Sequence, residues 1–159
     1  MLYAKAETKN SKPDIFEQIK KNINTLSKKK VVVGFPKGKL NSPHYENGES
    51  IIDVAIMNNY GYGVPRRDFM TPASKRWHKR CKEIAEEMGE DLTMGKINAD
   101  AFLSLLGEEG KEIISDEIVK LDTPPNSPYT IMMKGGKNNP LVDSGDMSKA
   151  PTYELRENA

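Results

Sequence analysis

The sequence predicts an α+β protein in which a small antiparallel or mixed sheet packs against several helices, including one long helix at about 72–94. Three observations predict this fold class. Apolar residues recur at spacings of three and four along several segments, which is the helical period. A β-branched run stands at Val31–Phe35, and alternating segments lie near both ends of the chain, as in strands. The 159 residues match the usual size of one domain, so we expect a single domain over 1–159.

The first predicted element is a short strand at Leu2–Thr8, where apolar and polar side chains alternate. One face of this strand carries Leu2, Ala4 and Ala6, and the other carries Tyr3, Lys5 and Glu7.

A helix and a buried strand should follow. The helix is predicted from a start signal at Ser11 to about Ser27, because isoleucine recurs at positions 15, 19 and 23. The lysines at 28–30 complement the negative end of its dipole. The apolar run Val31–Phe35, stopped by Pro36, then predicts a strand.

Two helices should flank a turn in the middle of the chain. Ser50 and Asp53 form a capping-box pair that starts the first helix, and Gly61 should terminate it. The long helix is predicted to begin with Thr71 as its cap and Pro72 at its first position.

A further helix is predicted from its cap at Asn98 to about Leu121, although Gly107 and Gly110 interrupt its apolar pattern. Each interior glycine costs about 1 kcal/mol relative to alanine. We therefore expect close backbone packing or a kink at these two positions.

Two segments have no sustained periodicity. Proline, glycine and asparagine punctuate residues 36–49, which predicts a mobile loop. Residues 122–159 should form an extended, loop-rich C-terminal segment that ends in a strand at Thr152–Arg156.

The charge and cysteine content exclude several classes of protein. The 24 Lys and Arg residues balance 23 Asp and Glu residues, so no global field concentrates DNA or an anionic membrane. Cys81 is the single cysteine, which rules out an internal disulfide. No apolar run approaches the roughly 20 residues that span a bilayer. We expect a soluble protein that is synthesised in the cytoplasm and has no membrane partner.

Few residues suggest catalysis or metal binding. His78 and Cys81 have a helical spacing that permits two metal ligands, but only one other histidine accompanies them, so we expect no metal site. Asp143, Ser144 and Asp146 gather two carboxylates and a hydroxyl in one turn, without a histidine nearby in the sequence. We interpret this as an Asx-type turn, with a hydrolase as the third-ranked hypothesis. The chain is expected to be no enzyme and to need no cofactor.

The turn between the two central helices is the strongest candidate for a binding surface, since aromatic and arginine side chains dominate the energetic centres of interfaces. The candidate interface residues in it are Tyr60, Tyr62, Arg66, Arg67 and Phe69. For Phe69, packing beneath the long helix is the alternative.

The long helix places its positive charges first and its negative charges afterwards, an order that opposes the helix dipole. This order has three interpretations: a solvated face, pairing of the basic half with the acidic half of another subunit, and contact with DNA. The basic residues that we add to the candidate interface are Lys75, Arg76, Lys79 and Arg80.

Several short motifs follow one another from about residue 31 onward. They are Val33-Gly34-Phe35-Pro36, Tyr45 and Gly48, Val54-Ala55, Asn58-Asn59-Tyr60-Gly61, Val64-Pro65, Arg67, Phe69-Met70, Ser127-Pro128-Tyr129-Thr130-Ile131 with Lys134-Gly135, Pro140-Leu141-Val142-Asp143-Ser144-Gly145-Asp146-Met147 and Thr152-Tyr153-Glu154-Leu155. This order resembles the tailed-bacteriophage virion-morphogenesis family of neck, head-tail connector and tail-completion proteins.

The chain departs from the family pattern at three positions. Asn59 stands where an acidic residue is usual, and Asp68 stands where a proline is usual. Pro151 replaces an apolar residue, which should confine the start of the last strand to a sheet edge.

The resemblance implies a structural α+β subunit of the virion that forms a homo-oligomeric ring, six-fold or twelve-fold, at the head-tail junction. Adjacent portal or adaptor and tail-terminator rings would be its partners, and DNA would pass through the lumen as cargo. The subunit would be synthesised in the host cytoplasm. The alternative is a DNA-binding accessory protein that acts in packaging or assembly.

Overall fold

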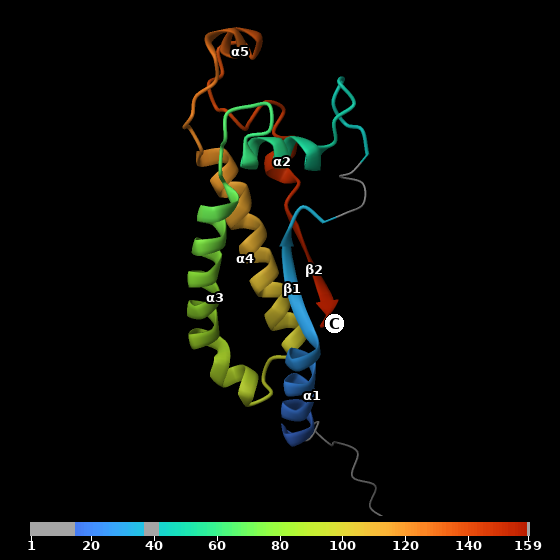
Figure 1. The fold of residues 1–159 in the computed structure, drawn as a ribbon. Coiled ribbons are helices and arrows are strands. Elements are labelled where there is room, and N and C mark those ends of the chain that lie inside the picture. The colour runs from blue at the N-terminus through green and yellow to red at the C-terminus, as the bar shows by residue number, and fades with distance from the viewer. Residues whose placement is uncertain (1–14, 37–41, 159) are drawn as a thin grey trace, which may run out of the picture.

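Two long antiparallel helices form the frame of the molecule, and a two-stranded antiparallel sheet packs beside the second of them (Figure 1). The computed structural model describes residues 15–36 and 42–158. The predicted strand at Leu2–Thr8 and the helix start at Ser11 lie outside these residues. The elements, in chain order, are α1 (Ile15–Lys28), β1 (Lys29–Gly34), α2 (Ile51–Tyr60), α3 (Met70–Thr93), α4 (Ala99–Lys120), α5 (Pro128–Met133), α6 (Asp146–Lys149) and β2 (Thr152–Glu157).

The predicted α+β class is confirmed, and the predicted long helix at 72–94 corresponds to α3. The strand predicted at Val31–Phe35 is shifted, because β1 begins at Lys29 and ends at Gly34. Two of the three consecutive lysines therefore belong to the sheet rather than to the end of α1. The described part of the predicted loop, residues 42–49, contains no helix or strand.

Two glycines of α4 allow its neighbours to approach its backbone closely. A Cβ atom at Gly107 would lie 2.3 Å from the Tyr153 ring of β2. A Cβ atom at Gly110 would lie 2.8 Å from the Trp77 indole nitrogen of α3 and 3.0 Å from a methyl carbon of Val33 in β1. The close packing predicted at these glycines is confirmed, and it seats both α3 and the sheet on α4.

The core consists of two clusters along this frame. The cluster nearest α2 includes Phe69, Ile114 and Ile118. The cluster nearest α1 includes Ile84 and Phe102. Side chains from α3 and α4 contribute to both, so these helices link the two ends of the molecule.

A buried asparagine fastens α1 to the turn between α3 and α4. Asn22 is 3% exposed, and its side-chain amide donates to the carbonyl oxygens of Leu92 and Ile97, each at 2.9 Å. Its side-chain oxygen accepts from the backbone N–H of Ala99 at 3.0 Å. Three backbone groups of the turn thus depend on one side chain.

Both predicted ends of α2 are confirmed. The Ser50 hydroxyl accepts from the backbone N–H of Asp53, and the Asp53 carboxylate accepts from the backbone N–H of Ser50, which is the reciprocal capping box. Gly61 ends the helix with a φ of 81°, in the left-handed region that favours glycine.

The predicted cap of α3 is wrong. The helix begins at Met70 rather than at Pro72, so Thr71 already lies inside it. Asp68 accepts from the backbone N–H of Thr71 at 3.0 Å, and Asn59 accepts from that of Met70 at 3.1 Å. These two side chains, which stand at departures from the family pattern, bond the first free donors of the helix.

The C-terminal segment contains two short helices before its strand. The Ser127 hydroxyl caps α5 by accepting from the backbone N–H of Thr130 at 3.1 Å. The predicted last strand is confirmed as β2, which pairs antiparallel with β1 and places Val31 opposite Leu155. The segment therefore ends by completing the sheet.

Candidate assembly interface

The turn between α2 and α3 presents two stacked tyrosines. Tyr60 and Tyr62 are 59% and 62% exposed, and their ring centroids lie 5.9 Å apart with an interplanar angle of 29°. The backbone N–H groups of Gly61 and Tyr62 both donate to the carbonyl oxygen of Met57. A Cβ atom at Gly61 would lie 2.9 Å from the Cβ of Arg66, so the turn closes tightly on itself. The tyrosines are thus carried by a backbone that α2 holds in place.

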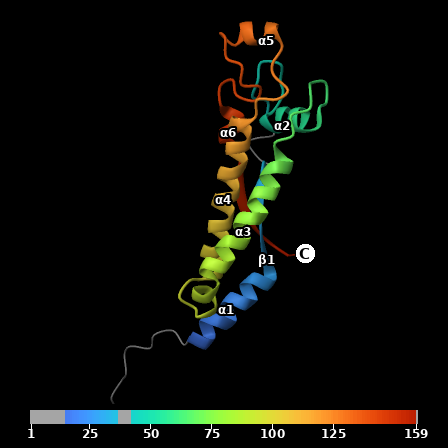
Figure 2. The same cartoon turned by 90° about the vertical axis from the view of Figure 1, so that its left-hand side faces the viewer.

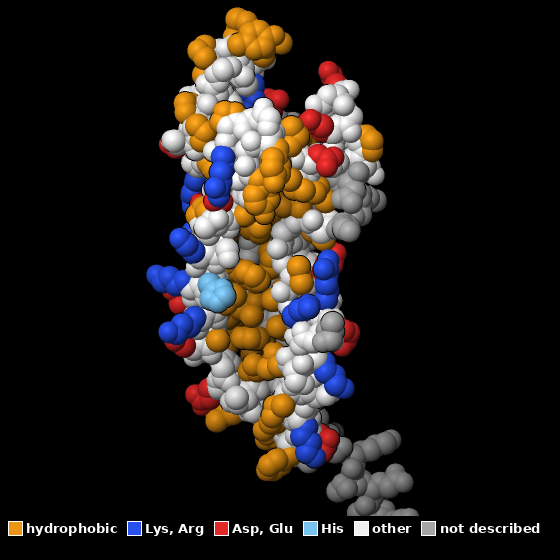
Figure 3. Space-filling view, in the orientation of Figure 1, with side chains coloured by type: hydrophobic (Ala, Val, Ile, Leu, Met, Phe, Trp, Pro, Cys, Tyr) orange, Lys and Arg blue, Asp and Glu red, His pale blue; other side chains and the backbone are white. Residues whose placement is uncertain are grey.

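An apolar hollow lies beside Tyr60, and Figure 3 shows hydrophobic side chains gathered on this face of the molecule. It encloses a cavity of about 190 Å³, whose lining includes Phe35, Ile52, Met70 and Tyr60. The outward side of α2 also exposes Ile56, by 43%. We call Ile56, Tyr60, Tyr62 and this cavity the aromatic patch.

The two arginines of the turn have different environments. Arg66 is exposed and forms an ion pair with Asp68 at 2.7 Å. Arg67 is only 7% exposed, which contradicts its assignment to a subunit interface. Burial lowers the pKa of its guanidinium, which nevertheless remains charged at physiological pH.

Arg67 joins the turn to the segment that follows α4. Its side chain donates to the carbonyl oxygens of Pro124 at 3.2 Å and Pro125 at 3.4 Å. It also donates to the side-chain oxygens of Asn58 at 3.0 Å and Asn126 at 3.2 Å. All four acceptors are neutral, so the charge is stabilised by oriented dipoles. Arg67 therefore has a structural role within the chain.

Phe69 is likewise part of the core and not of the surface. Its side chain is 1% exposed and contacts the Phe35 ring edge-on, with centroids 6.2 Å apart. The interface assignment of Phe69 is therefore wrong, and the alternative of packing beneath the long helix is confirmed.

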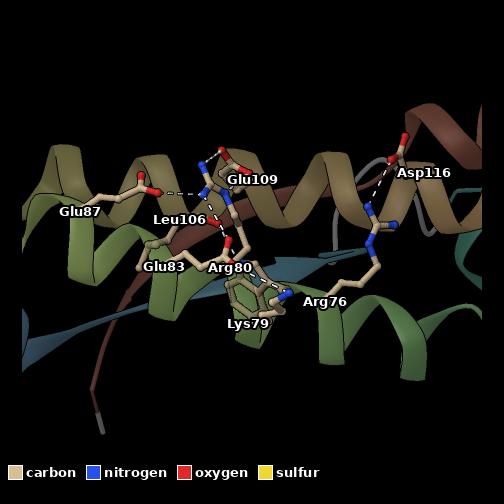
Figure 4. A network of polar contacts seen from close by, with 9 residues as sticks. Arg76, Lys79, Arg80, Glu83, Glu87, Leu106, Glu109 and Asp116 are labelled. Atoms are coloured by element: carbon tan, nitrogen blue, oxygen red, sulfur yellow. Dashed lines mark hydrogen bonds and ion pairs between the residues drawn. The ribbon is translucent and has the colours of Figure 1, made fainter.

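The arginines of α3 are engaged within the subunit (Figure 4). Arg76 forms ion pairs with Asp116 and Glu117 of α4. Arg80 meets both carboxylate oxygens of Glu109, at 3.2 and 3.4 Å. The hydrogen bonds with these α4 carboxylates raise the pKa of both guanidinium groups. One of the three interpretations of the charge order placed the acidic partners in another subunit, but α4 of the same chain supplies acidic partners for both arginines.

The two lysines among the candidates remain on the surface. Lys79 is 82% exposed and lies 3.8 Å from Glu83 in an i,i+4 pair. Lys75 is exposed, and within the described residues no ion pair involves it. These lysines are accessible, but the arginines beside them are already paired.

Sequence reasoning missed the exposed apolar side chains on α5 and α1. These two helices lie at opposite ends of the molecule (Figures 1 and 2). On α5, Tyr129, Met132 and Met133 are 66–68% exposed. On α1, Ile15 and Ile23 are 61% and 63% exposed. For α5, the sequence contains a signal: Ser127 and Pro128 start a helix, and an apolar run follows. A helix of only six residues has little room for a buried face, so its apolar side chains would be exposed.

A second cavity, of about 460 Å³, is lined by Tyr45, Lys134 and residues of the 140–147 turn. The Ser144 hydroxyl donates to the Asp146 carboxylate, and His44 lies 3.1 Å from the same carboxylate. A serine nucleophile needs the histidine between the hydroxyl and the carboxylate, and here the carboxylate is in the middle. The arrangement stabilises a turn and does not activate Ser144.

Among the described residues, no group of three or more His, Cys, Asp or Glu side chains could hold a metal ion. No helix in the described ranges has both the length and the apolar character needed to cross a membrane. Comparisons with protein-family models, curated proteins and solved structures found no match for this chain.

Proposed function

We propose that this chain is a structural assembly protein of the head-tail junction of a tailed bacteriophage, where copies form a ring that joins head to tail. The aromatic patch is the observation that carries the proposal. Clustered exposed aromatic and apolar side chains mark protein–protein contacts, and tyrosine is enriched at their energetic centres. The order of the sequence motifs, which resembles the virion-morphogenesis family, supports the head-tail junction as the place of assembly.

The exposed apolar surfaces are different from one another, which favours a ring over a two-fold dimer. The aromatic patch lies on α2, and further apolar side chains lie on α5 and α1. A contact between two different surfaces of identical subunits is heterologous, and it generates a ring when its rotation closes. The surfaces that the ring leaves free are available to the portal side and the tail side.

The first experiment determines the assembly and its location. Native mass spectrometry and electron microscopy of the purified protein, alone and with portal or tail, should show closed rings. Electron cryomicroscopy of virions should place the protein between head and tail. Particles made without the protein should accumulate as separate heads and tails, and normally joined particles would contradict the proposal.

A matched pair of variants tests the aromatic patch. Tyr62→Glu places a charge on the patch, and Ala85→Glu places the same charge on an exposed position of α3. Both subunits should fold, because both sites are exposed. Only Tyr62→Glu should abolish ring formation and head-tail joining. Equal behaviour of the two variants would exclude the patch as the contact.

DNA binding by an accessory protein is the competing outcome. The pairing of Arg76 and Arg80 with α4 carboxylates leaves Lys75, Lys79 and Lys82 as exposed cations of α3. Strong duplex binding by the isolated protein, falling steeply with salt, would favour the accessory role. Absence of binding at low salt would exclude it.

A further inference from the structure

The outer face of α3 carries a stripe of charged side chains. The helix lies along one side of the molecule with α4 on its inner side, so no other described element covers this face (Figures 1 and 2). At 3.6 residues per turn, the members of the stripe fall within about 80° of one another around the helix axis. Three lysines precede two glutamates in it, and these exposed residues are Lys75, Lys79, Lys82, Glu86 and Glu90.

The charges of the stripe are only loosely neutralised within the subunit. Lys79 lies 3.8 Å from Glu83, and Lys82 lies 4.0 Å from Glu86. Both lysine side chains are more than three-quarters exposed, and water weakens such pairs. Within the described residues no ion pair involves Lys75 or Glu90. The arginines of α3 are different, because carboxylates of α4 pair with them.

The order of the charges is complementary to itself under a two-fold rotation. When two copies of α3 lie antiparallel with the centre between positions 82 and 83, Lys79 lies opposite Glu86 of the second copy, since each is about 5 Å from the centre. The same register places Lys75 opposite Glu90 of the second copy, each about 11 Å from the centre. The rotation repeats both pairs, so one register matches opposite charges along both helices.

The residues nearest the centre do not oppose this contact. Neighbouring positions of a helix are about 100° apart around its axis, so Lys82 and Glu83 lie toward opposite borders of the stripe. Each has an ion-pair partner in its own helix, Glu86 for Lys82 and Arg80 for Glu83. Positions 79 and 86 lie within about 20° of each other, near the middle of the stripe. The Lys79–Glu86 contact therefore lies where two facing helices approach most closely.

An antiparallel pair also reverses the effect of the helix dipole. Within one copy, lysines in the first half of α3 and glutamates in its second half oppose the dipole. Between antiparallel copies, the positive end and basic half of one helix lie beside the negative end and acidic half of the other. The charge order that disfavours the isolated helix therefore favours the pair. DNA would use the basic half alone and gives no role to the glutamates.

We infer that α3 of one copy pairs antiparallel with α3 of a second copy, through Lys79–Glu86 and Lys75–Glu90 contacts related by a two-fold axis. This contact goes beyond the proposed function, because it uses a different surface from the aromatic patch and does not depend on a place in the virion. Absence of the protein from virions would overturn the proposed function and leave this inference standing.

Cross-linking of the full-length protein with a carbodiimide, which joins an amine directly to a carboxylate, tests the contact. An equal mixture of ¹⁴N-labelled and ¹⁵N-labelled protein, at the highest soluble concentration, should give Lys79–Glu86 and Lys75–Glu90 cross-links that contain both isotopes. Their yield should fall about tenfold between low salt and about 1 M salt, where the Debye length is about 3 Å. Tyr62→Glu should retain them, which separates this contact from the proposed ring. Cross-links within single copies only, or a yield that salt does not change, would overturn the inference.

Charge reversal tests the register, with the mixed-isotope Lys75–Glu90 cross-link as the readout. Lys79→Glu and Glu86→Lys should each lose the cross-link, because each variant sets like charges opposite one another in its own dimer. A mixture of the two variants should regain it, since their facing charges are then opposite. Lys21→Glu makes the same charge change at an exposed position of α1 and should behave as the wild type. Circular dichroism verifies that all variants are folded.

Two results of the charge-reversal experiment would contradict the antiparallel pair. The first is a mixture of Lys79→Glu and Glu86→Lys that fails to regain the cross-link although both variants are folded. The second is stronger duplex DNA binding by Glu86→Lys while the wild type gives no mixed-isotope cross-link at low salt, which would assign the lysines of the stripe to DNA.

Discussion

The burial of Arg67 leads to the sharpest stability prediction. Replacing Arg67 with alanine removes five N–H donors and leaves four acceptors, on Asn58, Pro124, Pro125 and Asn126, without their partner. An unsatisfied buried acceptor costs about 1–3 kcal/mol. Water that enters the vacated space will bond some of these atoms, so we expect a total loss of about 3–5 kcal/mol. That loss is a large share of the 5–15 kcal/mol typical of a domain.

The neighbouring Arg66 provides the matched control. Its side chain is 63% exposed and forms a surface ion pair with Asp68. Arg66→Ala should therefore change the free energy of unfolding by less than about 1 kcal/mol. Arg67→Lys should be intermediate, because one ammonium group cannot reach four separated acceptors.

Urea unfolding followed by fluorescence is the appropriate assay, since Trp77 is the only tryptophan and packs between α3 and α4. Circular dichroism should give the same midpoint if unfolding is two-state. Equal losses for Arg67→Ala and Arg66→Ala would refute the structural role of Arg67. A fully folded Arg67→Ala subunit that cannot assemble would restore Arg67 to the interface.

Three further predictions concern packing and capping. Gly107→Ala should lower the free energy of unfolding by about 1–3 kcal/mol, because the new Cβ would meet an aromatic ring. Gly89→Ala, where the new Cβ would enter open space, should raise this free energy by up to about 1 kcal/mol. The midpoints of denaturant unfolding measure both changes. Asn22→Ala should cost about 2–4 kcal/mol through lost buried hydrogen bonds. Hydrogen exchange should show a larger loss of protection in α1 than in the other helices, and an equal loss throughout the protein would contradict a role of Asn22 in fastening α1. Hydrogen bonds from Ser50 lower the pKa of Asp53, so their stabilisation is present above the unfolded pKa and is lost as the pH falls through the folded pKa. Ser50→Ala should reduce the decrease in the free energy of unfolding as the pH falls, which unfolding measured at a series of pH values would show. An unchanged pH dependence would argue against the capping box.

The parts of the fold that the sequence predicted well depend on neighbouring residues. Ser50, Asp53 and Gly61 identify the ends of α2 because caps act over three or four positions. Asn98 identifies the start of α4 for the same reason. The interior Gly107 pointed to close packing, although only the structure identifies the Tyr153 ring as the contact.

The errors concern residues whose partners are distant in the chain. Arg67 was assigned to the surface because its acceptors at Pro124 and Asn126 lie more than 50 positions away. The charge order of α3 left a solvated face, a second subunit and DNA as interpretations, and none of them was the observed pairing of Arg80 with Glu109, which forms only when α3 and α4 fold together. Local patterns do not contain this information.

The candidate interface is more apolar than the sequence predicted. With Arg67 buried and Arg76 and Arg80 paired internally, the accessible candidates are dominated by the tyrosines of the aromatic patch. Contacts between exposed charges weaken as added salt shortens the Debye length, which is about 8–10 Å near physiological ionic strength, and DNA binding falls steeply with salt. Apolar contacts are not screened, and sulfate strengthens them. Ring formation through the aromatic patch should therefore persist or increase in ammonium sulfate by light scattering, whereas dissociation there would mean that the ionic residues around the patch form the contact.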